Sequence, residues 1–271
     1  IGQGATTKVV NAIAVGSGTS ADGAQAVTIG HNSRSITNNS VALGNETRVA
    51  SLNGFALGNN ARAGYDETNK LIGLPNDQAF GSNARAYGGS SMAFGNDAKS
   101  SGGGAVSIGN GSQSRGDWAV AIGNGSETAA AVATPSATIN GVTHNFAGTN
   151  PASTVSVGKA GMERTVTNVA AGRISATSTD VINGSQLFAV KTEVEKGVSY
   201  AGDVKAAAAA DNKFTHKLGE QTNVVGGVTD VTKLTDNNIG VVSNGTDTLN
   251  IKLAKTLTGL ESVTAGNTKI D

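Results

Sequence analysis

The 271-residue sequence contains no cysteine, so neither a disulfide bond nor a thiolate metal site can stabilise it. Aromatic residues make up 4% and hydrophobic residues 38%, while 38 residues are glycine. This composition is poor material for a large globular core. No signal peptide or membrane-spanning stretch is visible, so we expect a region that is not inserted in a membrane. The sequence opens within a repeat at Ile1-Gly2, which predicts a fragment of a longer protein.

The net charge is zero, because 20 basic side chains balance 20 acidic ones. This balance argues against a basic stripe for phosphate backbones, and we expect no nucleic-acid partner. The three histidines, His31, His144 and His216, lie far apart and lack the spacing of metal ligands. Acidic residues occur only sporadically at turns, unlike the regular calcium-binding nonapeptide roll. We therefore predict no enzyme activity, no metal and no cofactor.

What the sequence does contain is a repeat of fixed length marked by glycine. The intervals are 14, 14, 14, 14, 23, 14, 14, 14 and 35, so two units carry insertions of 9 and 21 residues. The glycines are Gly2, Gly16, Gly30, Gly44, Gly58, Gly81, Gly95, Gly109, Gly123 and Gly158. Such a period predicts a repeat architecture over the segment 1–164.

Large apolar residues stand one and three positions before most of these glycines, with a small residue between them. Side chains alternate along a strand, so this pattern predicts a short strand with one apolar face. The repeat-core candidates are Ile13, Val15, Val27, Ile29, Val41, Leu43, Phe55, Leu57, Val106, Ile108, Val120 and Ile122. We expect a second short strand in each unit, whose small residues leave room for these large ones.

Residues suited to tight turns stand two positions after the glycines: Gly18, Asn32, Asn60, Asn83, Asp97, Gly111 and Gly125. One 14-residue unit is therefore predicted to be one coil of a two-strand solenoid. Such a thin solenoid would leave one apolar stripe in water, and self-association is the simplest way to cover it. We expect a symmetric oligomer.

Basic residues recur four positions after the glycines, at Arg34, Arg48, Arg62, Arg85 and Lys99. They indicate a solvated outer corner, or a row that helps the surface to meet an acidic or glycosylated partner. An ice-binding solenoid would need a regular threonine array, which this position does not supply. An acyltransferase β-helix would need a hexapeptide period and a catalytic histidine, and the 14-residue unit disfavours it.

The segment 166–187 carries a second motif, VTNVAAGRISATSTDVINGSQL. It resembles the neck motif VxxVAxGxxxxxSTDAVNGSQL of the trimeric autotransporter adhesins, with Val181 and Ile182 replacing the usual Ala and Val. The repeats are similar to the head motif xAxGxxAxA of the same family, most fully at NSVALGNET from Asn39 to Thr47. Matching neck positions are Val166, Val169, Ala170, Gly172, Ser178, Thr179, Asp180, Asn183, Gly184, Ser185, Gln186 and Leu187.

The resemblance implies a YadA-like passenger fragment with an all-β repeat fold. It implies a trimeric left-handed parallel β-roll head at 1–164, a neck and short coiled-coil helix at 165–197, and a β-rich stalk or secondary head module at 198–271. It also implies a homotrimer on the bacterial surface, anchored elsewhere in the outer membrane. Its expected partners are host extracellular matrix, host cells or other bacteria. The alternative is a structural spacer in a longer fibre that binds through another region.

The neck also has a local interpretation. Ser178, Thr179 and Asp180 are candidates for a helix N-cap, and Gly197 for its C-terminal stop. Leu187, Val190 and Val194 follow at helical spacing and predict a coiled-coil seam. Asn183 falls on the same seam, where a polar residue sets the register of a coiled coil and three symmetry-related amides could hold an anion. The alternative interpretation places Asn183 in the cap region of a surface helix. Val169 and Gly172 complete the predicted trimer contacts.

The insertions lie within 65–77 and 129–152, and we expect both to protrude as loops or hairpins. They are interpreted either as recognition loops or as buttresses against a neighbouring chain. The candidate recognition residues are Tyr65, Asp77, Thr143, His144 and Phe146. Farther along, Leu249–Lys255 alternates as a strand and Lys205–Asp211 is expected to be a short helical turn or spacer.

Overall fold

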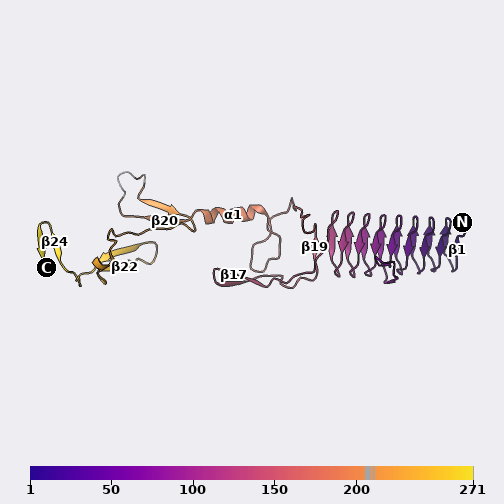
Figure 1. Ribbon diagram of the computed structural model, residues 1–271, viewed down its shortest axis with the longest axis horizontal. Helices are drawn as coiled ribbons and strands as arrows, with labels where there is room; N and C mark the ends of the chain where they lie inside the picture. The colour runs from indigo at the N-terminus through magenta and orange to yellow at the C-terminus, as the bar shows by residue number, and fades with distance from the viewer. Residues whose placement is uncertain (205–208, 210, 271) are drawn as a thin grey trace. The chain divides into compact units, whose positions relative to one another are not determined.

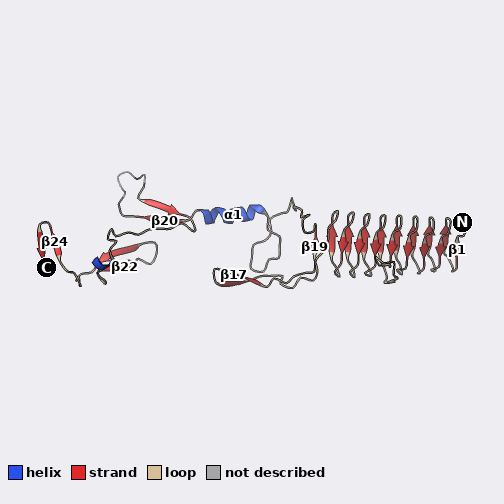
Figure 2. Cartoon of the chain, in the orientation of Figure 1, coloured by secondary structure: helices blue, strands red, loops and turns tan. Residues whose placement is uncertain are grey.

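The computed structural model describes residues 1–204, 209 and 211–270, and the chain divides into two compact units, Ile1–Gln186 and Leu187–Asp271 (Figure 1). The helical turn expected at Lys205–Asp211 lies largely outside the described residues. Strands dominate both units, and a single α-helix stands among the described residues (Figure 2).

Two parallel sheets make up the head. The nine-stranded sheet comprises β2 (Ile13–Val15), β4 (Val27–Ile29), β6 (Val41–Leu43), β8 (Phe55–Leu57), β10 (Gln78–Phe80), β12 (Met92–Phe94), β14 (Val106–Ile108), β16 (Val120–Ile122) and β19 (Val155–Ser156). The eight-stranded sheet comprises β1 (Thr6–Thr7), β3 (Ser20–Ala21), β5 (Arg34–Ser35), β7 (Arg48–Val49), β9 (Arg62–Ala63), β11 (Arg85–Ala86), β13 (Lys99–Ser100) and β15 (Gln113–Ser114).

The register of these sheets confirms the solenoid prediction. Val27 pairs with Val41 and Val41 with Phe55, so successive partners lie one repeat unit apart along the chain. The 9-residue insertion does not shift this alignment, because Phe55 pairs with Gln78. One 14-residue unit is therefore one coil of a parallel β-solenoid.

The interior of the coil differs from the expectation. The large repeat residues point outward and do not fill a core: Leu57 is 44% exposed and Val41 is partly exposed, whereas Ala42 and Ala56 between them are fully buried. The small residues of the second strand, such as Ser35, are buried as predicted. The prediction was wrong because the two sheets lie too close for anything larger than alanine, serine, threonine or an occasional valine.

Several hydroxyl groups of this interior are hydrogen-bonded to the backbone of the next coil. Thr47 Oγ1 donates to the Gly58 carbonyl at 2.6 Å, and Ser33 Oγ donates to the Gly44 carbonyl. Ser100 and Ser114 also bond to each other at 2.8 Å. These bonds offset the cost of burying hydroxyl groups, so the interior can be polar and still stable.

The repeat glycines adopt backbone conformations that other residues avoid. Gly44 has φ +136°, and a Cβ placed on it would lie 2.3 Å from the Gly58 carbonyl oxygen. The turn residues follow the prediction as well, since Asn32 and Asn60 have positive φ. The glycine register is therefore set both by φ and by the close stacking of successive coils.

Replacing Gly44 by alanine is expected to lower the free energy of unfolding by at least about 2 kcal/mol, because strained φ and a backbone clash act together. Gly116→Ala is the matched control, because its added Cβ would meet only the Ala119 Cβ at 3.8 Å. Thermal unfolding followed by circular dichroism would compare the two variants. Equal melting temperatures would contradict the stacking argument.

The remaining elements are short. The head insertion forms β17 (Ser136–Ile139) and β18 (Val142–Asn145), and the neck leads into helix α1 (Gly184–Glu195). The described residues of the second unit form three hairpins and one 3-10 turn: β20 (Val198–Ala201) with β21 (Lys213–His216), η1 (Val231–Lys233), β22 (Ile239–Ser243) with β23 (Leu249–Leu253), and β24 (Val263–Ala265) with β25 (Thr268–Ile270). The strand expected at Leu249–Lys255 is confirmed by β23.

Candidate binding surfaces

The outer face of the nine-stranded sheet is a continuous apolar surface. Two rows of large side chains run from coil to coil, and Ile13 and Phe94 on them are 50% and 55% exposed. Phe80 stacks on Phe55 with ring centroids 5.1 Å apart and lies 5.8 Å from Phe94. A run of apolar residues this long exceeds the scattered hydrophobic residues normal on a monomer. This surface, named here the apolar face, needs a partner.

Helix α1 presents a second apolar surface. No residue of the helix is buried, and Leu187, Val190 and Val194 are 67%, 56% and 48% exposed. Phe188 is 65% exposed and lies beside Lys191. Isolated helices of this length are marginally stable in water, so these side chains also call for packing against other chains. The predicted seam residues therefore remain candidates for trimer contacts.

The neck is a loop closed by its own hydrogen bonds. Gln186 bridges back to Gly172, accepting from its N–H at 2.9 Å and donating to its carbonyl at 2.6 Å. Asn183 Nδ2 donates to the Val169 carbonyl at 3.1 Å. The predicted contact residues Val169, Gly172 and Asn183 are thus joined within one chain.

Helix α1 begins later than the sequence suggested. The N-cap candidates Ser178 to Asp180 lie in the preceding loop, and Asp180 forms an ion pair with Arg173 at 2.8 Å. Asn183 stands directly before the helix, where its Oδ1 accepts from the Gln186 N–H at 3.4 Å. This amide matches the cap alternative, and an anion held by three copies of it stays a prediction. The helix ends at Glu195, so the predicted C-terminal stop at Gly197, which has φ +69°, is confirmed.

The first insertion folds back onto the roll that carries it. Asp66 Oδ1 accepts hydrogen bonds from the backbone N–H groups of Thr68 and Lys70, both at 2.9 Å, which forms a compact turn. The turn is fastened to the eight-stranded sheet: Glu67 pairs with Lys99 at 2.9 Å, and the Asp66 carbonyl accepts from Arg85. In this chain the insertion buttresses its own head, and Tyr65 is half-buried at its base.

Asp77 is not a recognition residue, because it is fully buried inside a coil. It occupies the position that Gly54 and Ser91 hold in the two neighbouring coils. Its Oδ1 accepts from Gly89 N–H at 2.8 Å and from Ser91 Oγ at 2.7 Å, while Oδ2 has no partner among the described residues. Asp77 was predicted to lie in a loop, because the sequence does not show where the 9-residue insertion ends.

Burial raises the pKa of Asp77 above its ordinary value, although hydrogen bonds from Ser91 and Gly89 oppose the shift. The folded state therefore binds the proton more tightly than the unfolded state, and the free energy of unfolding falls as the pH rises from about 4 through the folded pKa. Asp77→Ser should remove this dependence. Melting temperatures at pH 4 and pH 7 should show the wild type losing stability relative to the variant; a constant difference would contradict the assignment.

The second insertion is an exposed antiparallel hairpin. Thr138 pairs with Thr143 and Ala137 with His144 across β17 and β18, and the turn at Asn140 and Gly141 has positive φ at both residues. Both strands are largely accessible, and Phe146 beyond them is 44% exposed. The recognition candidates Thr143, His144 and Phe146 therefore share one accessible segment, and the expectation of a protruding hairpin is met.

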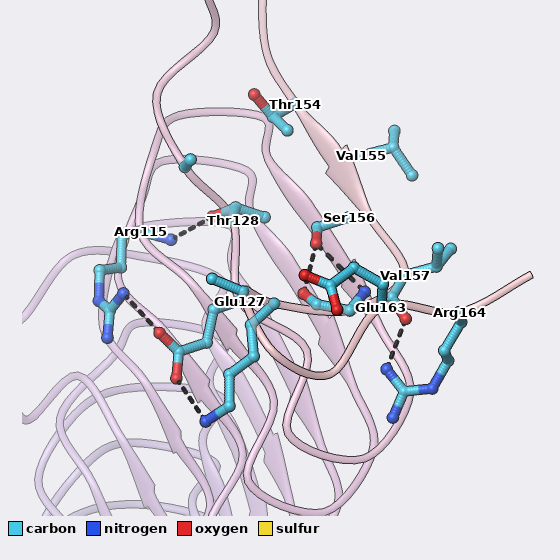
Figure 3. Close-up of a pocket in the computed structure, with 13 residues that line it drawn as sticks. Arg115, Glu127, Thr128, Thr154, Val155, Ser156, Val157, Glu163 and Arg164 are labelled. Carbon is cyan, nitrogen blue, oxygen red and sulfur yellow. Dashed lines mark hydrogen bonds and ion pairs between the residues drawn. The ribbon is translucent and has the colours of Figure 1, made fainter.

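A cavity of ≈ 680 Å³ lies where the roll ends (Figure 3). Glu127 bridges Arg115 at 3.2 Å and Lys159 at 3.3 Å. Arg164 donates to the carbonyls of Val157 and Asn124, both at 2.5 Å. These bonds satisfy backbone groups that the last coil leaves without a following strand. We interpret the cavity as the end cap of the solenoid.

The part of the chain that the structure describes has few clusters of side chains that could bind a metal or catalyse a reaction. No group of three or more His, Cys, Asp or Glu residues could hold a metal ion there. Across the same residues, no helix has the length and apolar character needed to cross a bilayer. The constant offset of the basic residues from the glycines left two interpretations open, a solvated outer corner or a row. Their pairing in one register forms a row.

Two models of known families match this sequence, one over the head repeats and one over the neck and the helix that follows it. The model described as the YadA head domain repeat matches residues 10–33, 21–47, 38–61, 79–98 and 100–126. The model described as the coiled stalk of trimeric autotransporter adhesin matches residues 165–210. Head repeats followed by a stalk segment define a class of trimeric surface adhesins. The chain belongs to the trimeric autotransporter adhesins of the YadA-like kind.

Individual relatives match parts of the chain. The autotransporter adhesin BtaE of Brucella suis biovar 1 is 46% identical over 97 residues, which are 36% of this chain and 12% of that protein. The C-terminal YadA-like domain of BPSL2063 from Burkholderia pseudomallei is 50% identical over 39% of this chain and 46% of that one, with a TM-score of 0.34. The collagen-binding domain of the Yersinia adhesin YadA is 23% identical over 72% and 89%, with a TM-score of 0.43.

Proposed function

We propose that this chain is a non-enzymatic segment of a homotrimeric bacterial surface fibre that attaches to host extracellular matrix, host cells or other bacteria. One observation carries the proposal: head repeats of an adhesin family form a regular solenoid with one uncovered apolar face. Three chains that join through this face would cover it and leave the eight-stranded sheets and the 136–145 hairpin for partners. Identical weak sites on three chains would then give avidity without a deep pocket.

The test is a solid-phase binding assay with the complete chain. The folded trimer is applied to immobilised matrix proteins and to cultured host cells, and autoagglutination is followed in parallel. We expect binding to at least one surface and much weaker binding by a monomeric variant. If a folded trimer binds none of them and does not agglutinate, the spacer alternative replaces the adhesive function.

A second experiment locates the adhesive part of the head. Removing the 21 extra residues within 129–152 restores the 14-residue unit and takes away the exposed hairpin. Unchanged stability with lost adhesion would assign recognition to Thr143, His144 and Phe146, whereas a large fall in melting temperature would favour a buttress between chains. Removing the 9 extra residues within 65–77, with Asp77 kept in place, should instead lower stability, because Glu67 and the Asp66 carbonyl anchor this insertion to the sheet.

A further inference from the structure

Five cationic side chains stand in consecutive register on the outer face of the eight-stranded sheet. Arg34 pairs with Arg48, Arg48 with Arg62, Arg62 with Arg85, and Arg85 with Lys99. We call these five residues the cation row. Neighbouring strands lie about 4.8 Å apart, so the row places five positive charges along about 20 Å of the coil axis.

Within the described part of the chain, only the two ends of the row form ion pairs with carboxylates. Arg34 pairs with Asp22 at 2.9 Å, and Lys99 pairs with Glu67 at 2.9 Å. Arg85 donates to uncharged acceptors, the Asp66 carbonyl at 2.6 Å and Asn69 Oδ1 at 3.0 Å.

Arg62 in the middle of the row is only 8% exposed, and it forms no ion pair with the described residues. Its Nη2 donates to Asn60 Oδ1 at 2.5 Å, while its buried Nε has no hydrogen-bond partner within the described chain. Burial lowers the pKa of Arg62, and the neighbouring Arg48 and Arg85 lower it further, against a smaller opposing effect of Tyr65 and Glu46. The three arginines dominate the charge at this point, and Glu46 offsets it only in part.

Arg48 beside it is exposed, and its guanidinium makes no hydrogen bond or ion pair to the residues that the structure describes. It lines a polar cavity of ≈ 400 Å³ together with Ser20, Asn32, Arg34 and Glu46. No large apolar side chain lines this cavity, so the apolar side chains of an acidic peptide would have no surface there to pack against. Its hydroxyl and amide groups instead suit the hydroxyl groups of a sugar.

We propose that the cation row binds an anionic polysaccharide of the sulfated glycosaminoglycan class, laid along the coil axis. Guanidinium groups pair with sulfate and carboxylate oxygens through two parallel hydrogen bonds, so a polymer with regularly spaced anions matches stacked arginines. Arg48 supplies the accessible contact, and Arg62 and Arg85 add positive potential behind it. This inference rests on the proposed extracellular role, because such glycans belong to the matrix and to host cell surfaces.

The experiment measures binding of the complete trimer to immobilised heparin by surface plasmon resonance over a range of NaCl concentrations. Arg48→Gln should weaken binding at least about tenfold, because each chain loses a charge-assisted hydrogen-bonding group. The affinity of this variant for heparin should also fall less steeply as the NaCl concentration rises. Lys70→Gln is the matched control: it removes one positive charge from the nearby insertion, off the row, and should bind like the wild type. Arg34→Gln provides a second variant on the row.

Polyglutamate and single-stranded DNA serve as competing polyanions. We expect both to compete with heparin much more weakly than free heparin does. Equal competition would overturn the assignment to a glycan, and equal heparin affinity of the wild type and Arg48→Gln, with both trimers folded, would overturn the role of the row. If the wild type adheres to cells but does not bind heparin at low salt, this inference fails while the adhesive function stands.

Discussion

Replacing Phe94 by aspartate is expected to dissociate the head of the trimer. Phe94 is 55% exposed in one chain, so the substitution would cost little if the chain worked alone. On the apolar face of a homotrimer, three carboxylates would instead enter a dry interface without partners, at a cost of several kcal/mol per buried unpaired charge. Sedimentation velocity should show loss of the trimer, and the melting temperature should fall steeply.

Trp118→Asp is the matched control for this prediction. Trp118 is an aromatic residue 66% exposed, but it lies at a turn with φ +56° and not on the apolar face. Aspartate tolerates that conformation, so the trimer should persist with a similar melting temperature. If the two variants behave alike, the apolar face is not the interface between chains.

Deleting one complete coil is expected to leave a folded protein, whereas deleting half a coil should not. Removal of His31–Gly44 takes away β5 and β6 and brings β4 beside β8 in the same register, with Thr28 opposite Ala56. Stability in such arrays is roughly a sum of units and nearest-neighbour contacts, so only a modest loss follows. This coil is chosen because the next one carries Ser51, whose hydroxyl bonds the insertion at Leu74.

Removal of His31–Thr37 alone takes away β5 and keeps β6. The backbone bonds from Ser20 and Asp22 to that strand, and from that strand to Thr47 and Val49, are lost at about 1 kcal/mol each. The chain would also return on the wrong side of the solenoid. Circular dichroism melting curves should separate the two deletions clearly, and coinciding curves would mean that the 14-residue unit is not the structural coil.

The solenoid could be predicted from the sequence because each coil repeats the same local requirements. Gly44 and its equivalents mark positive φ and tight stacking, and alternation around Ala42 marks a strand. The exposed apolar stripe was predicted, but the expectation that small residues of the second strand leave room inside for the large ones was wrong, since alternation defines two faces and does not say which one is the interior. The spacing between the sheets decides that, and spacing is a property of the assembled coils.

The neck and the insertions were less predictable for a different reason. Ser178, Thr179 and Asp180 are all good N-cap residues, so local preference could not show that Gln186 and Gly172 would hold this stretch as a loop. Asp77 likewise resembles a loop residue in sequence, and only the register of β10 with β8 places it inside a coil. In both cases contacts between distant residues override local chemistry.

The most direct test of this account is the mass of the purified chain in solution by sedimentation equilibrium at micromolar concentration. If identical chains cover the apolar face and the exposed seam of α1, the protein should be a single species of three times the 26.8 kDa chain mass. A folded monomer that remains soluble would contradict the assignment of both surfaces.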